Sequence, residues 1–161
     1  LVEGLDLEAV ASVREADFIL LTGVRDDRDG LFYQDILDQS LELRRPLICI
    51  NPDRVRFSGG RFTFSAGAVA DAYARMGGTV HALGKPHPAI YHYCARLFPD
   101  MNPARTLAVG DSLYHDVQGG ARFGAATAWV ISGIHQTFIR YVEDDRGVEP
   151  DWILPGFSWS E

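Results

Sequence analysis

The sequence predicts an α/β fold built on mostly parallel β-sheets. Short apolar runs alternate with segments of helical periodicity along all 161 residues, an alternation typical of parallel sheets covered by helices. Hydrophobic residues make up 47% of the chain, which is enough for a buried core at this length. No apolar run approaches the about 18 residues that a membrane-spanning helix needs, so no membrane partner is expected.

The first strand and the first helix are predicted between residues 16 and 45. The run ADFILLTG (16–23) is short and apolar, as a buried strand is. The helix is predicted over 31–45 because its apolar residues recur at helical spacing, and Pro46 ends it. The apolar face of this helix consists of Phe32, Ile36, Leu37 and Leu41.

The next stretch predicts a strand, a loop and a second helix. PLICINPD (46–53) has the apolar character of a buried strand, and 56–64 is expected to be a loop with short extended pieces. Ser65 is a good helix cap for the segment AGAVADAYARM (66–76), and the glycines at 77–78 end that helix.

A second series of alternating strands and helices begins at Thr79. This divides the chain into two predicted units, 1–78 and 79–161. The second unit is expected to hold a further parallel sheet. Its predicted strands are 79–84, 104–110, 125–133 and 151–154, and its predicted helices are 89–98, 114–124 and 136–143.

The net charge and the cysteine residues indicate which ligands and which cellular compartment to expect. The formal net charge of -7 disfavours binding to nucleic acid, which needs a clustered basic face. Cys49 and Cys94 lack CxxC spacing and lie in apolar patterns, so they are expected to be buried free thiols in a reducing cytoplasm. The start, LVEGLDLEAV, is neither an initiator segment nor a signal peptide, so we expect a piece of a longer protein.

Two acids follow the apolar strand over 104–110 in the stretch VGDSLYHD (109–116). Asp111 falls at the carboxyl end of a strand, where α/β sheets bind ligands, and Asp116 falls one helical turn further on. Mg²⁺ prefers carboxylate oxygens and needs few protein ligands, so the two acids are candidates to share one ion. Alternatively, Asp111 only caps the following helix, a role that Ser112 could also take. Asp116 would then be a first-turn acid favoured by the helix dipole.

A lysine in a stiff turn strengthens the ligand-binding interpretation. Lys85 lies in GKPHP (84–88), between a glycine and two prolines. This turn follows the strand predicted over 79–84. An ammonium group binds phosphate well, and a rigid turn would direct it. The alternative is a solvated turn lysine.

These segments together resemble the haloacid dehalogenase superfamily of aspartate-nucleophile phosphatases. NPD (51–53), the helix AGAVADAY, GKPHPAIY (84–91) and VGDSLYHD (109–116) occur in the order and spacing of that superfamily. More narrowly, the pattern is similar to the class IIA, NagD-like branch with an α/β cap. The resemblance implies that 1–78 is the later part of the cap and that 79–161 is the carboxyl-terminal half of the Rossmann-like core.

The resemblance also implies residue roles. Lys85 would be the third-motif lysine, Asp111 the fourth-motif acid that ligates Mg²⁺, and Asp116 the second acid of that motif. We therefore take Lys85 and Asp116 as catalytic candidates and Asp111 as the metal ligand. Asn51 and Ser112 are the candidates for substrate contact. His115 is next to the acid pair, and an exposed first-turn histidine is its expected state.

The nucleophile motif of this superfamily, an apolar strand ending in DxDG, is expected upstream of residue 1. DRDG (27–30) fits the four letters, but Thr22, Gly23, Val24 and Arg25 separate it from the apolar run before it. A nucleophile must lie directly at the end of its strand, so we interpret Asp27 as part of a polar turn.

The sequence therefore predicts part of a Mg²⁺-dependent phosphatase that acts on a small phosphorylated metabolite. This chain alone is expected to be inactive. The alternative is a non-catalytic α/β binding or interaction module derived from the same family. If the missing core strands leave apolar surface exposed, we expect the isolated chain to form homo-oligomers or to be poorly soluble.

Overall fold

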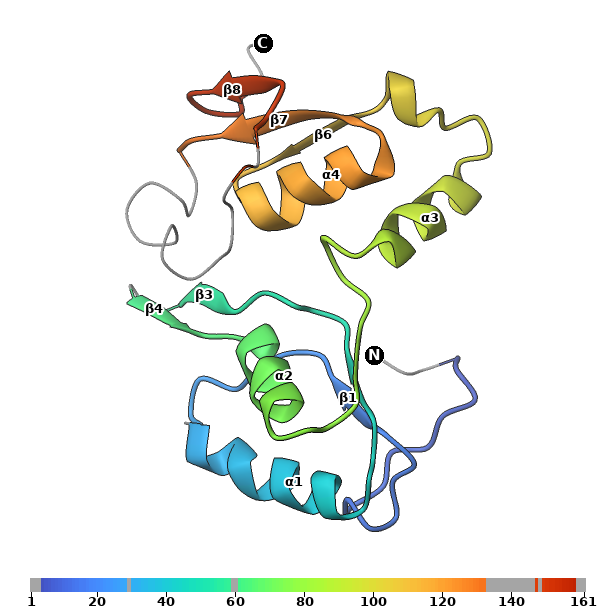
Figure 1. Ribbon diagram of the computed structural model, residues 1–161, viewed down its shortest axis with the longest axis vertical. Coiled ribbons are helices and arrows are strands. Elements are labelled where there is room, and N and C mark those ends of the chain that lie inside the picture. Colours follow the sequence, from blue (N-terminus) through green and yellow to red (C-terminus); the bar gives the residue numbers. More distant parts are fainter. Residues whose placement is uncertain (1–3, 29, 59–60, 133–146, 148, 159–161) are drawn as a thin grey trace.

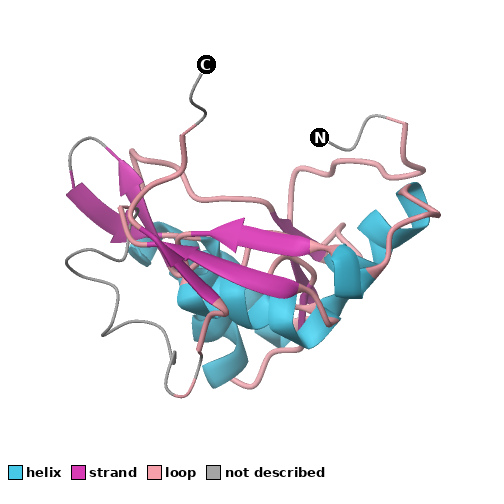
Figure 2. Ribbon diagram, turned by 90° about the horizontal axis from the view of Figure 1, so that it is seen from above, coloured by secondary structure: helices cyan, strands magenta, loops and turns pink. Residues whose placement is uncertain are grey.

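The computed structural model describes residues 4–28, 30–58, 61–132, 147 and 149–158. Its elements form two units, each with a three-stranded parallel sheet and two helices (Figure 1). The second view shows the helices gathered on one side of the strands (Figure 2). The α/β fold and the mostly parallel sheets are therefore as the sequence predicts.

The first unit contains a sheet with the strand order β1-β2-β5. All pairs are parallel, with Leu20 opposite Ile48 and Ile48 opposite His81. Its elements are β1 (Ile19–Leu21), α1 (Gly30–Glu42), β2 (Leu47–Cys49), α2 (Ala66–Arg75) and β5 (Val80–Ala82).

The core of the first unit lies between α1, α2 and this sheet. Tyr73 is completely buried, and its hydroxyl donates to the Arg45 carbonyl at 2.6 Å, which satisfies the one polar atom of that side chain. Leu37 is the buried centre of the apolar face of α1. The buried cluster consists of Leu21, Leu37, Leu47, Cys49, Ala66, Val69, Ala70 and Tyr73.

A hairpin occupies the segment that was expected to be a loop with short extended pieces. Strands β3 (Val55–Ser58) and β4 (Arg61–Phe64) pair antiparallel, with Arg56 opposite Thr63. The hairpin forms a sheet of its own and leads directly into α2. Ser65 takes the cap position of α2 in an extended conformation, although its side chain makes no capping hydrogen bond.

The second unit contains a sheet with the strand order β6-β7-β8, again parallel throughout. The Asp151 carboxylate ties the start of β8 to β7, because it accepts from the Thr127 amide at 2.8 Å and from the Thr127 hydroxyl at 3.0 Å. The elements are α3 (Pro88–Leu97), the 3₁₀ turn Pro103–Arg105, β6 (Leu107–Gly110), the turn η2 (Leu113–Val117), α4 (Gln118–Phe123), β7 (Ala126–Val130) and β8 (Trp152–Leu154). The predicted helix over 136–143 lies outside the described residues.

Strand β5 pairs differently from the expectation. The sequence pattern assigned 79–84 to the second sheet, but β5 hydrogen-bonds to β2 and completes the first sheet. Sheet membership therefore changes after Ala82, in the turn that carries Lys85. The division into folding units at residues 78 and 79 stays a prediction.

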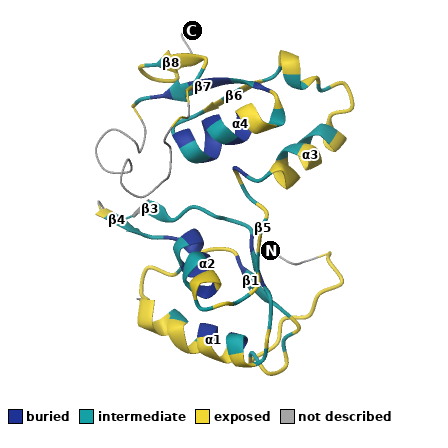
Figure 3. Ribbon diagram, viewed as in Figure 1, coloured by how far each residue is buried: buried dark blue, intermediate teal, exposed yellow. Residues whose placement is uncertain are grey.

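One face of the second unit leaves apolar side chains exposed. Residues alternate along β6, so Ala108 is directed toward Gly120 of α4, whereas Leu107 and Val109 remain exposed. Helix α3 buries none of its residues, and its ribbon is coloured partly exposed and partly intermediate (Figure 3). Other exposed apolar residues of this unit are Ile90, Tyr93, Leu97, Phe98, Trp152 and Ile153.

Both cysteines are free thiols, as expected, but Cys94 on α3 is only partly buried, contrary to the expectation. Cys49 is buried in the first core, and burial raises the pKa of its thiol. Among the described residues, no helix combines the length and the apolar character required to cross a membrane.

Candidate functional site

The site begins at the carboxyl end of β6, where Gly110 is followed by Asp111. The Trp129 indole nitrogen donates to the Asp111 carbonyl at 3.0 Å, which holds the end of β6 against β7. In parallel sheets the carboxyl ends of the strands meet at one edge, and loops at that edge bind ligands. The structure therefore places Asp111 where the sequence pattern expected it, at the carboxyl edge of the β6-β7-β8 sheet.

The turn that follows is π-helical rather than α-helical. The Val117 amide donates to the Ser112 carbonyl, five residues earlier, at 3.1 Å. Ser112 caps this turn, since its hydroxyl accepts from the His115 amide at 3.0 Å. The capping residue of η2 is thus Ser112 and not Asp111. A single wide turn of this kind is frequent at functional sites.

Asp116 is the buried carboxylate of the site, with only 8% of its surface exposed. Its Oδ1 atom accepts a hydrogen bond from the Lys85 ammonium, and its Oδ2 atom accepts from the Ser112 amide at 3.1 Å. A buried carboxylate is stable only if it is paired and hydrogen-bonded, and both conditions are met here. The structure brings Lys85 and Asp116 together, although 31 positions separate them in the sequence.

Gly110 leaves the space that the Asp116 carboxyl group occupies. A Cβ atom at Gly110 would collide with the Cβ, the Cγ and the Oδ2 of Asp116. The close approach of the β6 backbone to the carboxyl group therefore requires glycine at this position.

Lys85 lies in the connection between the two units. Pro86 beside it is fully buried, and the Lys85–Pro86 peptide bond is cis. Gly84 packs so closely on Pro52 and on the Ile50 carbonyl that a Cβ atom there would overlap both. The turn with Lys85 thus rests on the turn that follows β2, while the lysine side chain remains 52% exposed and accessible to a ligand.

His115 is a residue that the sequence interpretation placed wrongly. It was expected to be exposed, but only 4% of its surface is accessible, because the π-helical turn rotates it inward. Its Nδ1 atom lies 3.1 Å from the Ser112 hydroxyl, and its Nε2 atom lies 3.3 Å from Oδ1 of Asp53 in the first unit. His115 therefore joins the cap of η2 to the turn after β2.

Asn51 also belongs to the turn after β2. Its side-chain oxygen accepts from the Asp53 amide at 3.3 Å, and its carbonyl accepts from the Cys49 thiol at 3.2 Å. These contacts support the turn-forming role that the sequence suggested for Asp53. Substrate contact by Asn51 or Ser112 stays a prediction.

Tyr91 contacts the same turn from α3. Its hydroxyl donates to the His115 carbonyl at 3.3 Å, and its ring stacks on Phe123 of α4 with 5.5 Å between the centroids. Burial, with a smaller contribution from Asp116, raises the pKa of Tyr91 to about 12.

This raised pKa of Tyr91 predicts a loss of stability at alkaline pH. An unfolded tyrosine ionises near pH 10, so the folded state binds more protons than the unfolded state between about pH 10 and about pH 12. The contribution of Tyr91 is therefore complete below about pH 10 and is lost as the pH rises through this window. Urea denaturation across this range should show a steeper decline for the natural chain than for Tyr91→Phe; parallel declines would contradict the assignment.

The side-chain oxygen atoms at this edge are of the chemical type that Mg²⁺ prefers. Asp111 supplies a hard carboxylate oxygen at the strand end, whereas both oxygens of Asp116 are engaged by Lys85 and Ser112. Within the described part of the chain, no three His, Cys, Asp or Glu side chains gather as a complete metal cage. Mg²⁺ does not require such a cage, because it keeps several waters and binds through one or two carboxylates and a substrate phosphate.

Asp27 lies far from any position suited to a nucleophile. Strand β1 ends at Leu21, six residues earlier, and the Asp27 carboxylate pairs with Arg25 at 2.9 Å. The hydrogen bond from Arg25 is the main cause that lowers the pKa of Asp27. These contacts support the interpretation of this segment as a polar turn.

Comparisons with known proteins identify related hydrolases. A family model described as "HAD-hyrolase-like" matches residues 82–159. A hydrolase of the haloacid dehalogenase-like family from Brucella suis superposes with a TM-score of 0.83 and 30% identity, over 98% of this chain and 61% of its own. The curated proteins compared with the sequence provide no match.

Two phosphatases share the fold at lower identity. A p-nitrophenyl phosphatase from Archaeoglobus fulgidus has a TM-score of 0.69 and 22% identity, over 91% of this chain and 56% of its own. A possible sugar phosphatase from Cytophaga hutchinsonii has a TM-score of 0.66 and 23% identity, over 89% and 53%. The chain thus spans between half and two thirds of the length of these structures. From the family match, residues 82–159 belong to the haloacid dehalogenase-like hydrolase family, and the likeness to the Brucella suis hydrolase of that family extends over 98% of the chain.

Proposed function

We propose that this chain is the carboxyl-terminal part of a Mg²⁺-dependent phosphatase that hydrolyses a small phosphorylated metabolite. The observation that carries the proposal is the Lys85–Asp116 ion pair beside Asp111, at the carboxyl edge of a parallel sheet. This arrangement offers a phosphate one ammonium group and one metal-binding carboxylate. Phosphoryl transfer depends mainly on such positioning and charge neutralisation.

Lys85 is the residue that would hold the phosphate. Its ammonium is partly exposed, and Asp116 fixes its position from the buried side. The Ser112 amide in turn holds the Asp116 carboxylate. Asp116 is therefore a positioning residue for Lys85.

Asp111 would hold the Mg²⁺ ion, which supplies charge neutralisation for the transferred phosphoryl group when it is bound. The nucleophile in this proposal is an aspartate in a segment that precedes Leu1. Its carboxylate attacks phosphorus, the ester bond to the leaving group breaks, and the leaving oxygen takes a proton. Water then hydrolyses the aspartyl phosphate, which regenerates the carboxylate and releases phosphate.

Exposed apolar side chains on the second unit support the proposal that additional strands or helices of the intact protein cover them. Leu107 and Val109 of β6 and Ile153 of β8 are exposed in the β6-β7-β8 sheet. Burial of such residues by additional strands or helices would stabilise the fold. The motif order supports the class IIA, NagD-like branch, and the two free thiols support a cytoplasmic location.

The test is the release of p-nitrophenol from p-nitrophenyl phosphate, with and without Mg²⁺ and with a chelator. It compares this 161-residue chain with a longer chain that restores the residues proposed to precede Leu1. We expect Mg²⁺-dependent release by the longer chain and none by the 161-residue chain.

Two outcomes would overturn the proposal. Chelator-sensitive activity in the 161-residue chain would mean that the nucleophile lies within it, and Asp27 would then be mutated first. A folded longer chain without activity toward this and other phosphate monoesters would favour the non-catalytic binding module.

A further inference from the structure

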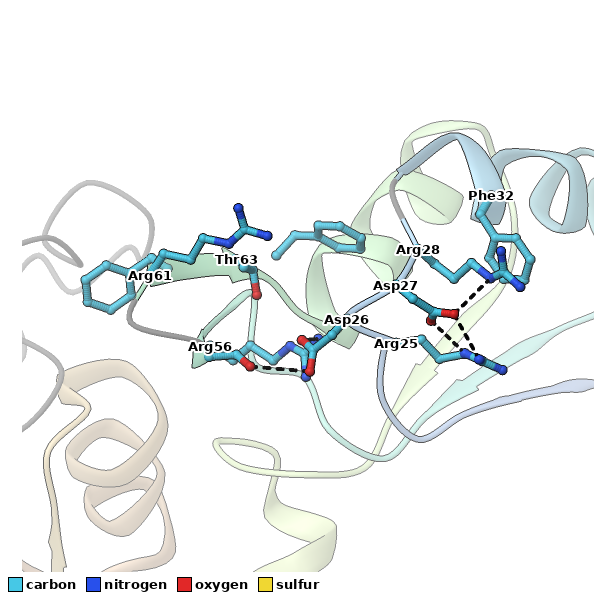
Figure 4. A pocket seen from close by; sticks show the side chains of 11 residues that line it. Arg25, Asp26, Asp27, Arg28, Phe32, Arg56, Arg61 and Thr63 are labelled. Atoms are coloured by element: carbon cyan, nitrogen blue, oxygen red, sulfur yellow. Dashed lines mark hydrogen bonds and ion pairs between the residues drawn. The ribbon is translucent and has the colours of Figure 1, made fainter.

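A groove of about 1070 Å³ lies in the first unit, between the β1–α1 connection and the β3–β4 hairpin (Figure 4). Its lining shares no residue with the Lys85–Asp116 site. The described lining residues include four arginines, Arg25, Arg28, Arg56 and Arg61, and two aspartates, Asp26 and Asp27.

The polar residues with which the hairpin lines this groove share one face of the hairpin, whereas the lining residues Phe62 and Phe64 alternate to the other face. Arg56 is opposite Thr63 in the β3–β4 pairing, and Ser58 is opposite Arg61. Because side chains alternate along a strand, these four residues lie on the same face of the hairpin. The close-up shows Arg56 directed toward Asp26 across the groove.

The charges of the groove leave cations in excess. Asp26 is bound by Arg56 at 2.6 Å, and Asp27 is bound by Arg25 at 2.9 Å with Arg28 3.9 Å away. Among the described lining residues the four arginines exceed the two aspartates by two charges. Such a site attracts anions.

Two buried donors in the groove have no protein partner within the described ranges. These are Nε of Arg56 and the hydroxyl of Thr63, which belong to the same cross-strand pair. The Arg56 guanidinium already uses Nη2 to bind Asp26, so its Nε remains a fixed donor. A buried donor without an acceptor destabilises a fold, so an oxygen acceptor that reached either atom would stabilise it.

The groove also has aromatic walls. The Arg28 guanidinium lies 4.6 Å from the centre of the Phe32 ring, and Phe64 packs edge-on against Tyr33. Phe32 and Phe64 line the groove with the arginines. A ligand with an apolar part beside its anionic group would therefore contact both kinds of side chain.

We propose that this groove binds a small phosphate-bearing molecule, whose oxygen atoms are held by Arg56 and Thr63. Arginine suits this task, because its planar donors match phosphate oxygens. The site is separate from the one that contains Lys85, and it does not depend on the proposed phosphatase activity.

Calorimetric titration of the 161-residue chain with phenyl phosphate and with inorganic phosphate tests the proposal. All variants carry Lys85→Ala together with Asp116→Asn, so that binding at the other site does not contribute and no buried charge is left unpaired. We expect Arg56→Gln to weaken phenyl phosphate binding about tenfold or more, because a hydrogen bond to a charged group is lost. Thr63→Val should weaken it severalfold, and phenyl phosphate should bind more tightly than inorganic phosphate.

The matched control is Arg75→Gln, which removes the same charge from the exposed end of α2, outside the groove. Affinity lost equally in this control would mean unspecific attraction and would overturn the proposal, as would the absence of binding in a folded chain that carries Lys85→Ala and Asp116→Asn. Arg56→Gln also breaks the pair with Asp26, so its fold is checked by circular dichroism. If it does not fold, Thr63→Val decides, because it leaves that pair intact; unchanged affinity there rejects the site.

Discussion

Asp111→Asn is expected to lower the phosphatase activity of the longer, active protein at least about 100-fold, while the fold is retained. The physical reason is the loss of a negative charge at the end of β6, since a neutral amide is a weaker ligand for a hard divalent cation. The hydrogen bond from Trp129 remains possible in this variant, because it goes to the carbonyl of residue 111 and not to the substituted side chain. The measurement is kcat/KM for p-nitrophenyl phosphate over a range of Mg²⁺ concentrations.

The control for this prediction is Asp100→Asn, which removes the same charge from an exposed residue in the loop after α3. It should leave kcat/KM unchanged. If Asp111→Asn retains full turnover at every Mg²⁺ concentration, Asp111 is not the metal ligand, and the proposed role of this strand end is wrong.

Local patterns in the sequence predicted most of the described strands and helices, apart from the β3–β4 hairpin and the π-helical turn. They did not predict which strands would be neighbours in a sheet. The apolar run over 79–84 correctly predicted a strand. It contained no information on whether β2 or β6 would be its partner, because hydrophobic periodicity describes one element at a time. The pairing of β5 with β2 follows from three-dimensional packing, including the contact of Gly84 with Pro52.

Two residues of the candidate site could be selected from sequence motifs. Lys85 and Asp116 were selected from their segments, and the structure joins them. The burial of His115 was not predictable, because an α-helical turn after Ser112 would have oriented it differently. We find no sequence signal for the π-helical turn that brings His115 within 3.3 Å of Asp53.

The largest effect on stability is expected from Gly110→Ala. The added Cβ atom would overlap the carboxyl group of Asp116, which is held by Lys85 and by the Ser112 amide. Either β6 or the buried carboxylate must shift, so the free energy of unfolding should fall by about 1–3 kcal/mol, the usual cost of overpacking. Urea denaturation of the 161-residue chain measures this change.

Gly23→Ala is the matched control, because no atom lies within 4 Å of the position that its Cβ would take. At such a site alanine also restricts the unfolded chain, so the free energy of unfolding should stay the same or rise slightly. Equal effects of the two substitutions would mean that the close contact between Gly110 and Asp116 does not constrain the site. A loss confined to Gly110→Ala, together with lower activity in the longer protein, would show that the backbone of β6 positions Asp116 and, through it, Lys85.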